Sequence, residues 1–255
     1  MEYRATRTGP WTAMASNALV FPSLQQITPH LPPSTVDALT NLLADSASYN
    51  RTVSNLPPSY MASTPLLLGY LSQIYSLLPR LSLPTTPLFE VLNNNAGGLT
   101  VSLMHPLSRG TVNIGSISPF IPPLIDPRWL SHPLDTTTLL AALQFNAAIL
   151  NTTAIRELQP SFRPDGVPEF PDESFLRDWI KRGIRTEFHA SGTAAMMPRR
   201  LGGVVDDRLR VYGVEGLRVV DTSVFPVIPA AHLQSVAYAV AEKAADLVKS
   251  DAGRW

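Results

Sequence analysis

Two histidines stand in contexts suited to chemistry, in a sequence of 255 residues that contains only five histidines. His189 lies in "FHASGTAAM", one residue before a Ser-Gly-Thr turn whose glycine lets the backbone approach a ligand closely. His232 lies in "PAAHLQSV", at the expected start of a helix. An imidazole ionises near neutral pH, so such rings serve as general acids and bases. We expect the two histidines to form one acid–base site.

The helix that begins after His232 adds an electrostatic element to this predicted site. A helix N-terminus presents unpaired N–H groups and the positive end of the helix dipole, both of which favour an electron-rich group. The other three histidines each stand beside a proline, where an ordinary structural role is the simpler interpretation. They are His30, His105 and His132.

The composition excludes several classes of function. Lys plus Arg and Asp plus Glu both number 20, without long blocks of either sign, so nucleic acid and membranes are poor partners. Cysteine is absent, which excludes disulfides and thiolate metal sites, and we predict no bound metal. The N-terminus lacks a signal-peptide pattern, and no apolar stretch is long enough to span a bilayer. We expect a soluble protein, cytoplasmic if Met1 is the true start.

The pattern of apolar residues predicts an α+β fold, in which an antiparallel sheet is flanked by helices. Strands are expected between about residues 88 and 118, where alternating segments are separated by glycine turns. "GLRVVD", which ends at Asp221, is expected to be a further strand. An apolar segment at 64–79 fits either a helix or a strand. Helices are expected at 34–48, at 134–155 with Asp135 or Thr136 as cap, at 173–183, and from Leu233 to Leu247.

Three stretches together resemble the glucose–methanol–choline (GMC) flavoprotein oxidoreductases. They are "FHASGTAAM", the segment from "VVDDRLRVYG" to the C-terminal helix, and "MHPLSRGTVNIGS" with the following "SPFIPPLIDPRWLSHPLD". The resemblance implies an FAD cofactor and a small-molecule alcohol substrate. It places His189 and His232 against the flavin, where one takes the alcohol proton while hydride moves to the flavin. It also implies flavin contacts at Asp221, His232, Leu233 and Gln234; for Asp221, a capping role in the next turn is the alternative.

The glycine pattern departs from this family in one respect. The family binds FAD through an N-terminal βαβ unit with a G-x-G-x-x-G turn, and none of the fourteen glycines here has that spacing. The resemblance therefore implies a substrate-binding and catalytic domain at 1–215, with a strand and helix at 216–255 that complete an FAD-binding domain. The N-terminal Rossmann half has no counterpart. We expect the chain to require an N-terminal FAD-binding half, or a homo-oligomer, as partner.

Three functions remain open on this sequence. The first is alcohol oxidation as part of a truncated flavoenzyme, with FAD bound weakly or not at all by the chain alone. The second is acid–base chemistry without redox turnover, such as cyclisation or dehydration. The third is an inactive remnant that binds a partner or a small molecule. For the first, we assign His232 as base, because a helix start favours a neutral imidazole, and His189 as hydrogen-bond donor to the substrate oxygen.

Overall fold

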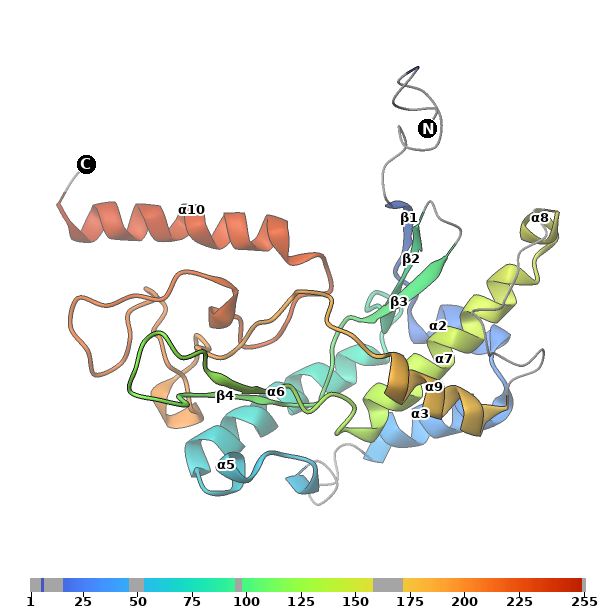
Figure 1. Ribbon diagram of the computed structural model, residues 1–255, viewed down its shortest axis with the longest axis horizontal. Coiled ribbons are helices and arrows are strands. Elements are labelled where there is room, and N and C mark those ends of the chain that lie inside the picture. Colours follow the sequence, from blue (N-terminus) through green and yellow to red (C-terminus); the bar gives the residue numbers. More distant parts are fainter. Residues whose placement is uncertain (1–5, 7–15, 46–52, 95–97, 158–171, 254–255) are drawn as a thin grey trace. The chain divides into compact units, whose positions relative to one another are not determined.

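The computed structural model describes residue 6 and residues 16–45, 53–94, 98–157 and 172–253 (Figure 1). The chain divides into two compact units, and each is assembled from three separated segments. The first unit comprises Met1–Ala44, Leu81–Met104 and Pro133–Ile184; the second comprises Asp45–Arg80, His105–His132 and Arg185–Trp255. The domain boundary expected after residue 215 stays a prediction.

The first unit is built on a three-stranded antiparallel sheet. Its strands are β1 (Ser16–Val20), β2 (Phe89–Asn94) and β3 (Leu99–Leu103), in the order β1-β2-β3. In the register, Val91 of the central strand pairs with Val20 on one side and Val101 on the other. The α+β class with an antiparallel sheet between 88 and 118 is confirmed. β1 was not predicted, because its pairing partner lies far along the chain.

Helix α7 (Pro133–Leu150) supplies the core that covers this sheet. It is apolar on nearly all sides, and its N-terminal half is buried, including Leu140, Ala141 and Ala142. Its Phe145 ring meets the buried Phe89 ring of β2 at a centroid distance of 6.0 Å. The predicted cap, Asp135, lies inside the first turn, because the helix begins at Pro133, a favourable residue for that position.

The remaining helices of the first unit follow local signals. Asp172 caps α9 (Glu173–Gly183) by accepting a 2.7 Å hydrogen bond from the Phe175 N–H, and the helix ends at the predicted glycine. The helix predicted at 34–48 is present as α3 (Pro33–Asp45), which begins one residue earlier than expected, and the predicted residues 46–48 lie outside the described residues. The shorter elements are α2 (Leu24–Ile27), η2 (Thr28–His30) and α8 (Thr153–Arg156).

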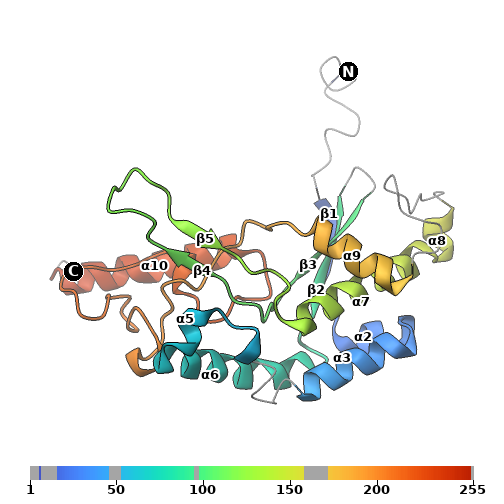
Figure 2. The same ribbon diagram turned by 60° about the horizontal axis from the view of Figure 1, so that its bottom comes forward.

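The second unit has little sheet and several irregular segments (Figure 2). The segment at 64–79, whose sequence fits either a helix or a strand, is part of the helix α6 (Thr64–Leu81). β4 (Thr111–Asn113) and β5 (Leu124–Asp126) form a two-stranded antiparallel ribbon. The other elements are α5 (Pro58–Met61), η3 (Arg199–Leu201), η4 (Thr222–Val224) and α10 (Leu233–Asp251). No helix among the described residues has both the length and the apolar character to cross a membrane.

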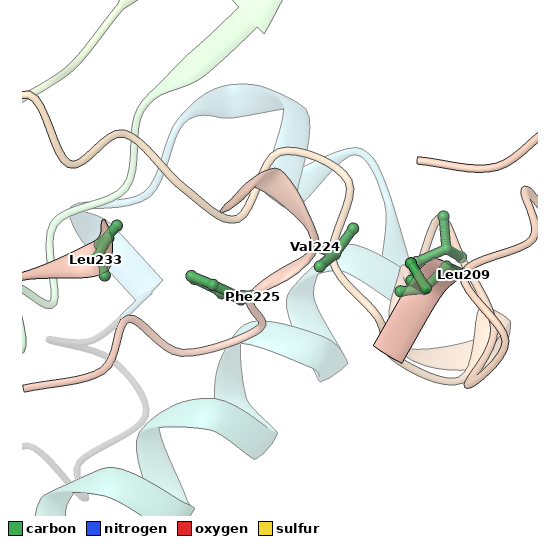
Figure 3. Packing of buried hydrophobic residues seen from close by; sticks show 6 residues of the cluster. Leu209, Val224, Phe225 and Leu233 are labelled. Atoms are coloured by element: carbon green, nitrogen blue, oxygen red, sulfur yellow. The ribbon is translucent and has the colours of Figure 1, made fainter. Parts of the chain in front are cut away.

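A compact apolar cluster holds the irregular segments of the second unit together (Figure 3). It joins one face of α10 to the segment before η4 and to η4 itself. The helix predicted from Leu233 is confirmed, and one apolar stripe of it faces this cluster: Leu233 and Ala244 belong to the cluster, and Val236 and Val240 pack against it. The buried members are Val205, Leu209, Val224, Phe225, Leu233 and Ala244.

The strand predicted for "GLRVVD" is wrong for the described residues. This segment makes one isolated antiparallel bridge, between Arg210 and Arg218. Backbone hydrogen bonds flank the bridge, from Val211 N to Leu217 O at 3.0 Å and from Val219 N to Leu209 O at 3.1 Å. A β-strand is formed by hydrogen bonds to a neighbouring strand along its length. Here only residues 217–219 pair, with residues 209–211 on the other side of a short turn.

Candidate active site

His189 is placed by backbone hydrogen bonds and not by a helix or strand. It lies in an irregular segment that runs beside η4. The N–H groups of Ala194 and Met196 donate to carbonyl oxygens of η4 at 2.9 and 2.8 Å. The hydroxyl of Thr222 donates back to the Ala190 carbonyl at 2.9 Å. The segment after His189 is therefore fixed to the element that begins after Asp221.

The predicted glycine turn after His189 is present at Gly192. Its φ is +88°, in the left-handed region that favours glycine. A Cβ at this position would stand 3.3 Å from the Phe225 carbonyl oxygen. The close approach that we predicted toward a ligand is thus made, in this structure, toward the backbone directly after η4.

His232 is the residue directly before α10. Its backbone is extended, with φ −61° and ψ 129°, and the helix starts at the next residue. That residue, Leu233, is only 3% exposed and belongs to the apolar cluster. Burial of Leu233 therefore anchors the helix start and fixes where the His232 side chain leaves the backbone.

The structure brings the two predicted histidines together. The ring centroids of His189 and His232 are 5.2 Å apart, and the ring planes meet at 81°, edge to face. Both residues are half-buried. Two imidazoles at this separation can each reach one small polar group placed between or beside them, which is the geometry that an acid–base pair requires. Their catalytic roles stay a prediction.

The other predicted site residues differ in exposure and in their contacts. Asp221 is exposed, and its carboxylate accepts a 2.8 Å hydrogen bond from the Ser223 N–H, which caps η4. This is the capping role expected as its alternative. Gln234 is exposed in the first turn of α10. The Leu233 side chain is buried, so Leu233 can contact a ligand only through its backbone. No group of three metal-binding side chains occurs in the described part of the chain.

Two of the remaining histidines have the structural roles expected of them, and one lies near the site. The His30 ring packs on Phe145 at a centroid distance of 5.8 Å, and the buried His132 donates its backbone N–H to the Ser108 hydroxyl at 3.0 Å. The His105 Nδ1, in contrast, lies 3.1 Å from the carbonyl oxygen of Ile228, in the loop that leads to His232. No local pattern signals this contact, because it joins distant segments.

Comparison with known proteins assigns the class. The GMC oxidoreductase family model for the C-terminal region matches residues 106–241, a range that includes the histidine pair, Asp221 and the start of α10. The chain belongs to the GMC oxidoreductase family. The resemblance inferred from the motifs is thereby confirmed.

The relatives are longer proteins. The chain is 38% identical over 162 residues to GMC oxidoreductase family protein Mala s 12 from Malassezia sympodialis, which covers 62% of this chain and 26% of that protein. It is 41% identical over 154 residues to patulin synthase from Penicillium expansum, covering 59% and 24%. The match thus spans about a quarter of the length of these relatives.

Solved structures support the same assignment over nearly the whole chain. An FAD-dependent oxidoreductase from Chaetomium thermophilum matches with a TM-score of 0.86 and 29% identity, covering 98% of this chain and 42% of that one. A fungal aryl-alcohol oxidase matches with a TM-score of 0.79 and 30% identity, covering 96% and 40%. The fold is therefore that of the C-terminal portion of a GMC flavoprotein.

Proposed function

We propose that this chain provides the substrate-side portion of a flavin-dependent enzyme that oxidises the alcohol group of a small molecule. The observation that carries the proposal is the edge-to-face pair of His189 and His232 at the start of α10, in a chain of the GMC family. The names of two structural relatives, an FAD-dependent oxidoreductase and an aryl-alcohol oxidase, support this class of reaction.

The two rings divide the work on the substrate hydroxyl. His232 accepts the hydroxyl proton at a ring nitrogen, while His189 donates a hydrogen bond to the same oxygen and fixes its position. Removing that proton makes the alcohol oxygen electron-rich, which drives the carbon–oxygen bond toward a carbonyl. When bound, FAD supplies the oxidising ring that takes a hydride from the carbon. Because the two imidazoles are close together, one substrate oxygen can hydrogen-bond to both.

The residues around the pair suit one end of the cofactor. The first turn of α10 offers backbone N–H groups and a positive dipole end, which favour an electron-rich ring edge. Gln234 is exposed in that turn and Asp221 is exposed directly before η4, and both would hold polar groups of FAD. No G-x-G-x-x-G turn for the pyrophosphate occurs in the sequence. We therefore assign pyrophosphate binding to an FAD-binding half that works with this chain.

An apolar surface on the β4–β5 ribbon supports such a partner. The connection between the strands exposes Ile114 at 88% and Phe120 at 91%, and residues 111–125 include no charged side chain. A contiguous exposed apolar patch is a feature of surfaces that bind another protein. The FAD-binding half would cover the ribbon, with residues 1–215 acting as substrate domain and 216–255 completing the cofactor domain.

Assembly with a related FAD-binding half tests the proposal. The chain would be co-expressed with the N-terminal portion of the Penicillium expansum patulin synthase, and bound flavin and carbonyl formation from a panel of primary alcohols would be measured. We expect a flavin-containing complex that oxidises at least one alcohol, and no turnover with the double variant His189→Ala/His232→Ala. A flavin-loaded complex that oxidises none, or a double variant as active as the wild type, would overturn the proposal.

The ribbon surface has its own control in the same experiment. Phe120→Asp places a charge on the apolar surface and should reduce recovery of the complex. Met61→Asp changes another exposed apolar side chain, on α5 and outside the ribbon, and should not. Equal recovery for both variants would remove the ribbon from the proposed interface.

A further inference from the structure

A hydrogen bond from His105 joins the segment after β3 to the loop that precedes His232. The Nδ1 of His105 lies 3.1 Å from the carbonyl oxygen of Ile228. Because a carbonyl can only accept, the proton of this hydrogen bond lies on Nδ1. Burial lowers the pKa of the His105 imidazole, and the bond to Ile228 only partly offsets this, so the ring is neutral at neutral pH with Nδ1 as its donor.

The loop that receives this bond lacks two of its six backbone donors. Residues 226–231 read "PVIPAA", and the two prolines have no N–H to give. Anchoring of this loop therefore depends on its carbonyl groups and on its side chains. The side chain of Ile228 packs against the apolar cluster, while its carbonyl receives the His105 proton. Ile228 is thus held from two directions.

The other end of the short path to His232 is held as well. Leu233, directly after His232, is buried in the same apolar cluster. His232 therefore stands between two anchors, Ile228 before it and Leu233 after it. Removing the His105 bond releases one anchor and leaves the prolines and alanines of the loop free to shift. A displacement of about 1 Å between reacting groups can cost on the order of 100-fold in rate.

We propose that His105 is a positioning residue, which holds the Ile228 carbonyl so that the ring of His232 meets that of His189. This inference rests on the proposed function for its catalytic consequence, but its structural part concerns the chain alone. We assign His105 no contact with the substrate. It acts on turnover through the loop and His232.

Three substitutions separate positioning from simple packing. His105→Asn keeps a donor, because the Asn side-chain N–H₂ occupies nearly the place of Nδ1. His105→Leu has a similar size to Asn and no donor. His105→Gln is polar and fills the space, but its donor corresponds to Nε2 and points away from Ile228. The matched control outside the second unit is His30→Leu, which removes a ring packed on Phe145.

The first measurement uses the full chain without cofactor. Nuclear Overhauser contacts between the two imidazole rings, together with their ring proton shifts, report whether the pair is in place. We expect the contacts between His189 and His232 to survive in His105→Asn and His30→Leu, and to be lost in His105→Leu and His105→Gln. Unchanged contacts in a folded His105→Gln or His105→Leu overturn the proposal; if the Leu variant does not fold, the Gln variant decides.

The second measurement uses the chain assembled with an FAD-binding half. His105→Gln should lower turnover at saturating substrate by up to about 100-fold, with His105→Asn close to the wild type. Flavin content should be equal in both, since neither His105 nor Ile228 is among the residues assigned to the cofactor. If the ring contacts are lost in His105→Gln while turnover stays at the wild-type value, the positioning role stands and the catalytic role of the histidine pair fails.

Discussion

The ring of His189 lies edge to face with that of His232, at a centroid distance of 5.2 Å, although neither residue belongs to a helix or a strand. Each is held by the residues directly after it in the chain. His189 precedes a segment bonded to η4, and His232 precedes the buried Leu233. η4 and Leu233 contribute to the same apolar cluster, so packing in that cluster fixes the two rings relative to each other.

Single substitutions of the two histidines should have different kinetic effects in the assembled enzyme. His232→Ala removes the base, and should lower turnover by roughly 10²–10⁴. His189→Ala removes a hydrogen bond that positions the substrate, and should also raise the Michaelis constant. Steady-state kinetics over a range of alcohol concentrations measures both effects, with bound flavin quantified in each variant. A far larger loss of turnover at saturating substrate in His189→Ala would reverse the two roles.

The purified chain alone should be colourless. Much of the affinity for a dinucleotide comes from backbone N–H groups and a helix dipole at its pyrophosphate, and the sequence has no G-x-G-x-x-G turn to supply them. An absorbance spectrum between about 350 and 500 nm, the range of the oxidised flavin, tests this. Stoichiometric flavin absorbance in the isolated chain would be incompatible with the assignment of pyrophosphate binding to another half.

Local signals in the sequence predicted the long helices α3, α7, α9 and α10, and left α6 open between a helix and a strand. α9 has an aspartate cap and a terminal glycine, and α10 has an apolar stripe, so both were predictable from neighbouring residues alone. Non-local pairing was not predictable. β1 forms only because β2 lies beside it. The residues of "GLRVVD" favour a strand, but within this segment only Arg218 forms a bridge, to Arg210.

In the candidate site, too, local features were predictable and non-local contacts were not. His189 and His232 were predicted from their motifs and from the resemblance to a family, and the structure brings their rings together. The capping role of Asp221 was foreseen as an alternative, because an Asp before a turn commonly accepts from the N–H two residues on. The bond from His105 to Ile228 could not be predicted, since it depends on the tertiary path of two distant loops.

Gly69 allows α6 to approach the backbone at η3, and replacing it should destabilise the protein. In a helix, Gly69→Ala alone would gain about 1 kcal/mol from propensity. A Cβ at this position, however, would lie 2.1 Å from the Leu201 carbonyl oxygen, and backbone cannot move aside easily. We expect a net loss of about 1–3 kcal/mol in the free energy of unfolding.

Urea unfolding of Gly69→Ala measures this loss, and Gly183→Ala is the control. At Gly183, which ends α9, a Cβ would meet nothing within 4 Å, so the substitution should be neutral or slightly stabilising. Equal stability of Gly69→Ala and the wild type would show that α6 does not pack as closely on Leu201 as described.

Asp251 fastens the end of α10 to the segment that bears the Arg210–Arg218 bridge. Its two carboxylate oxygens accept hydrogen bonds from the guanidinium groups of Arg208 and Arg218. A carboxylate at a helix C-terminus is otherwise unfavourable, because the helix dipole is negative there. The bond from Arg208, with a smaller contribution from Arg218, holds the pKa of the Asp251 carboxyl below its ordinary value.

Asp251→Asn should therefore lower the thermal midpoint at neutral pH, and this difference from the wild type should disappear in acid. Because folding lowers the pKa of the carboxyl, its contribution is complete above the unfolded-state pKa of about 3.9 and is lost as the pH falls through the folded-state pKa. Thermal unfolding of both proteins from neutral pH down to about pH 2 measures the difference. Asp178→Asn, in an exposed 3.5 Å pair with Lys181, should change little at any pH. A difference in thermal midpoint between wild type and Asp251→Asn that stays constant across this range would contradict a stabilising role for the bonds from Arg208 and Arg218 to Asp251.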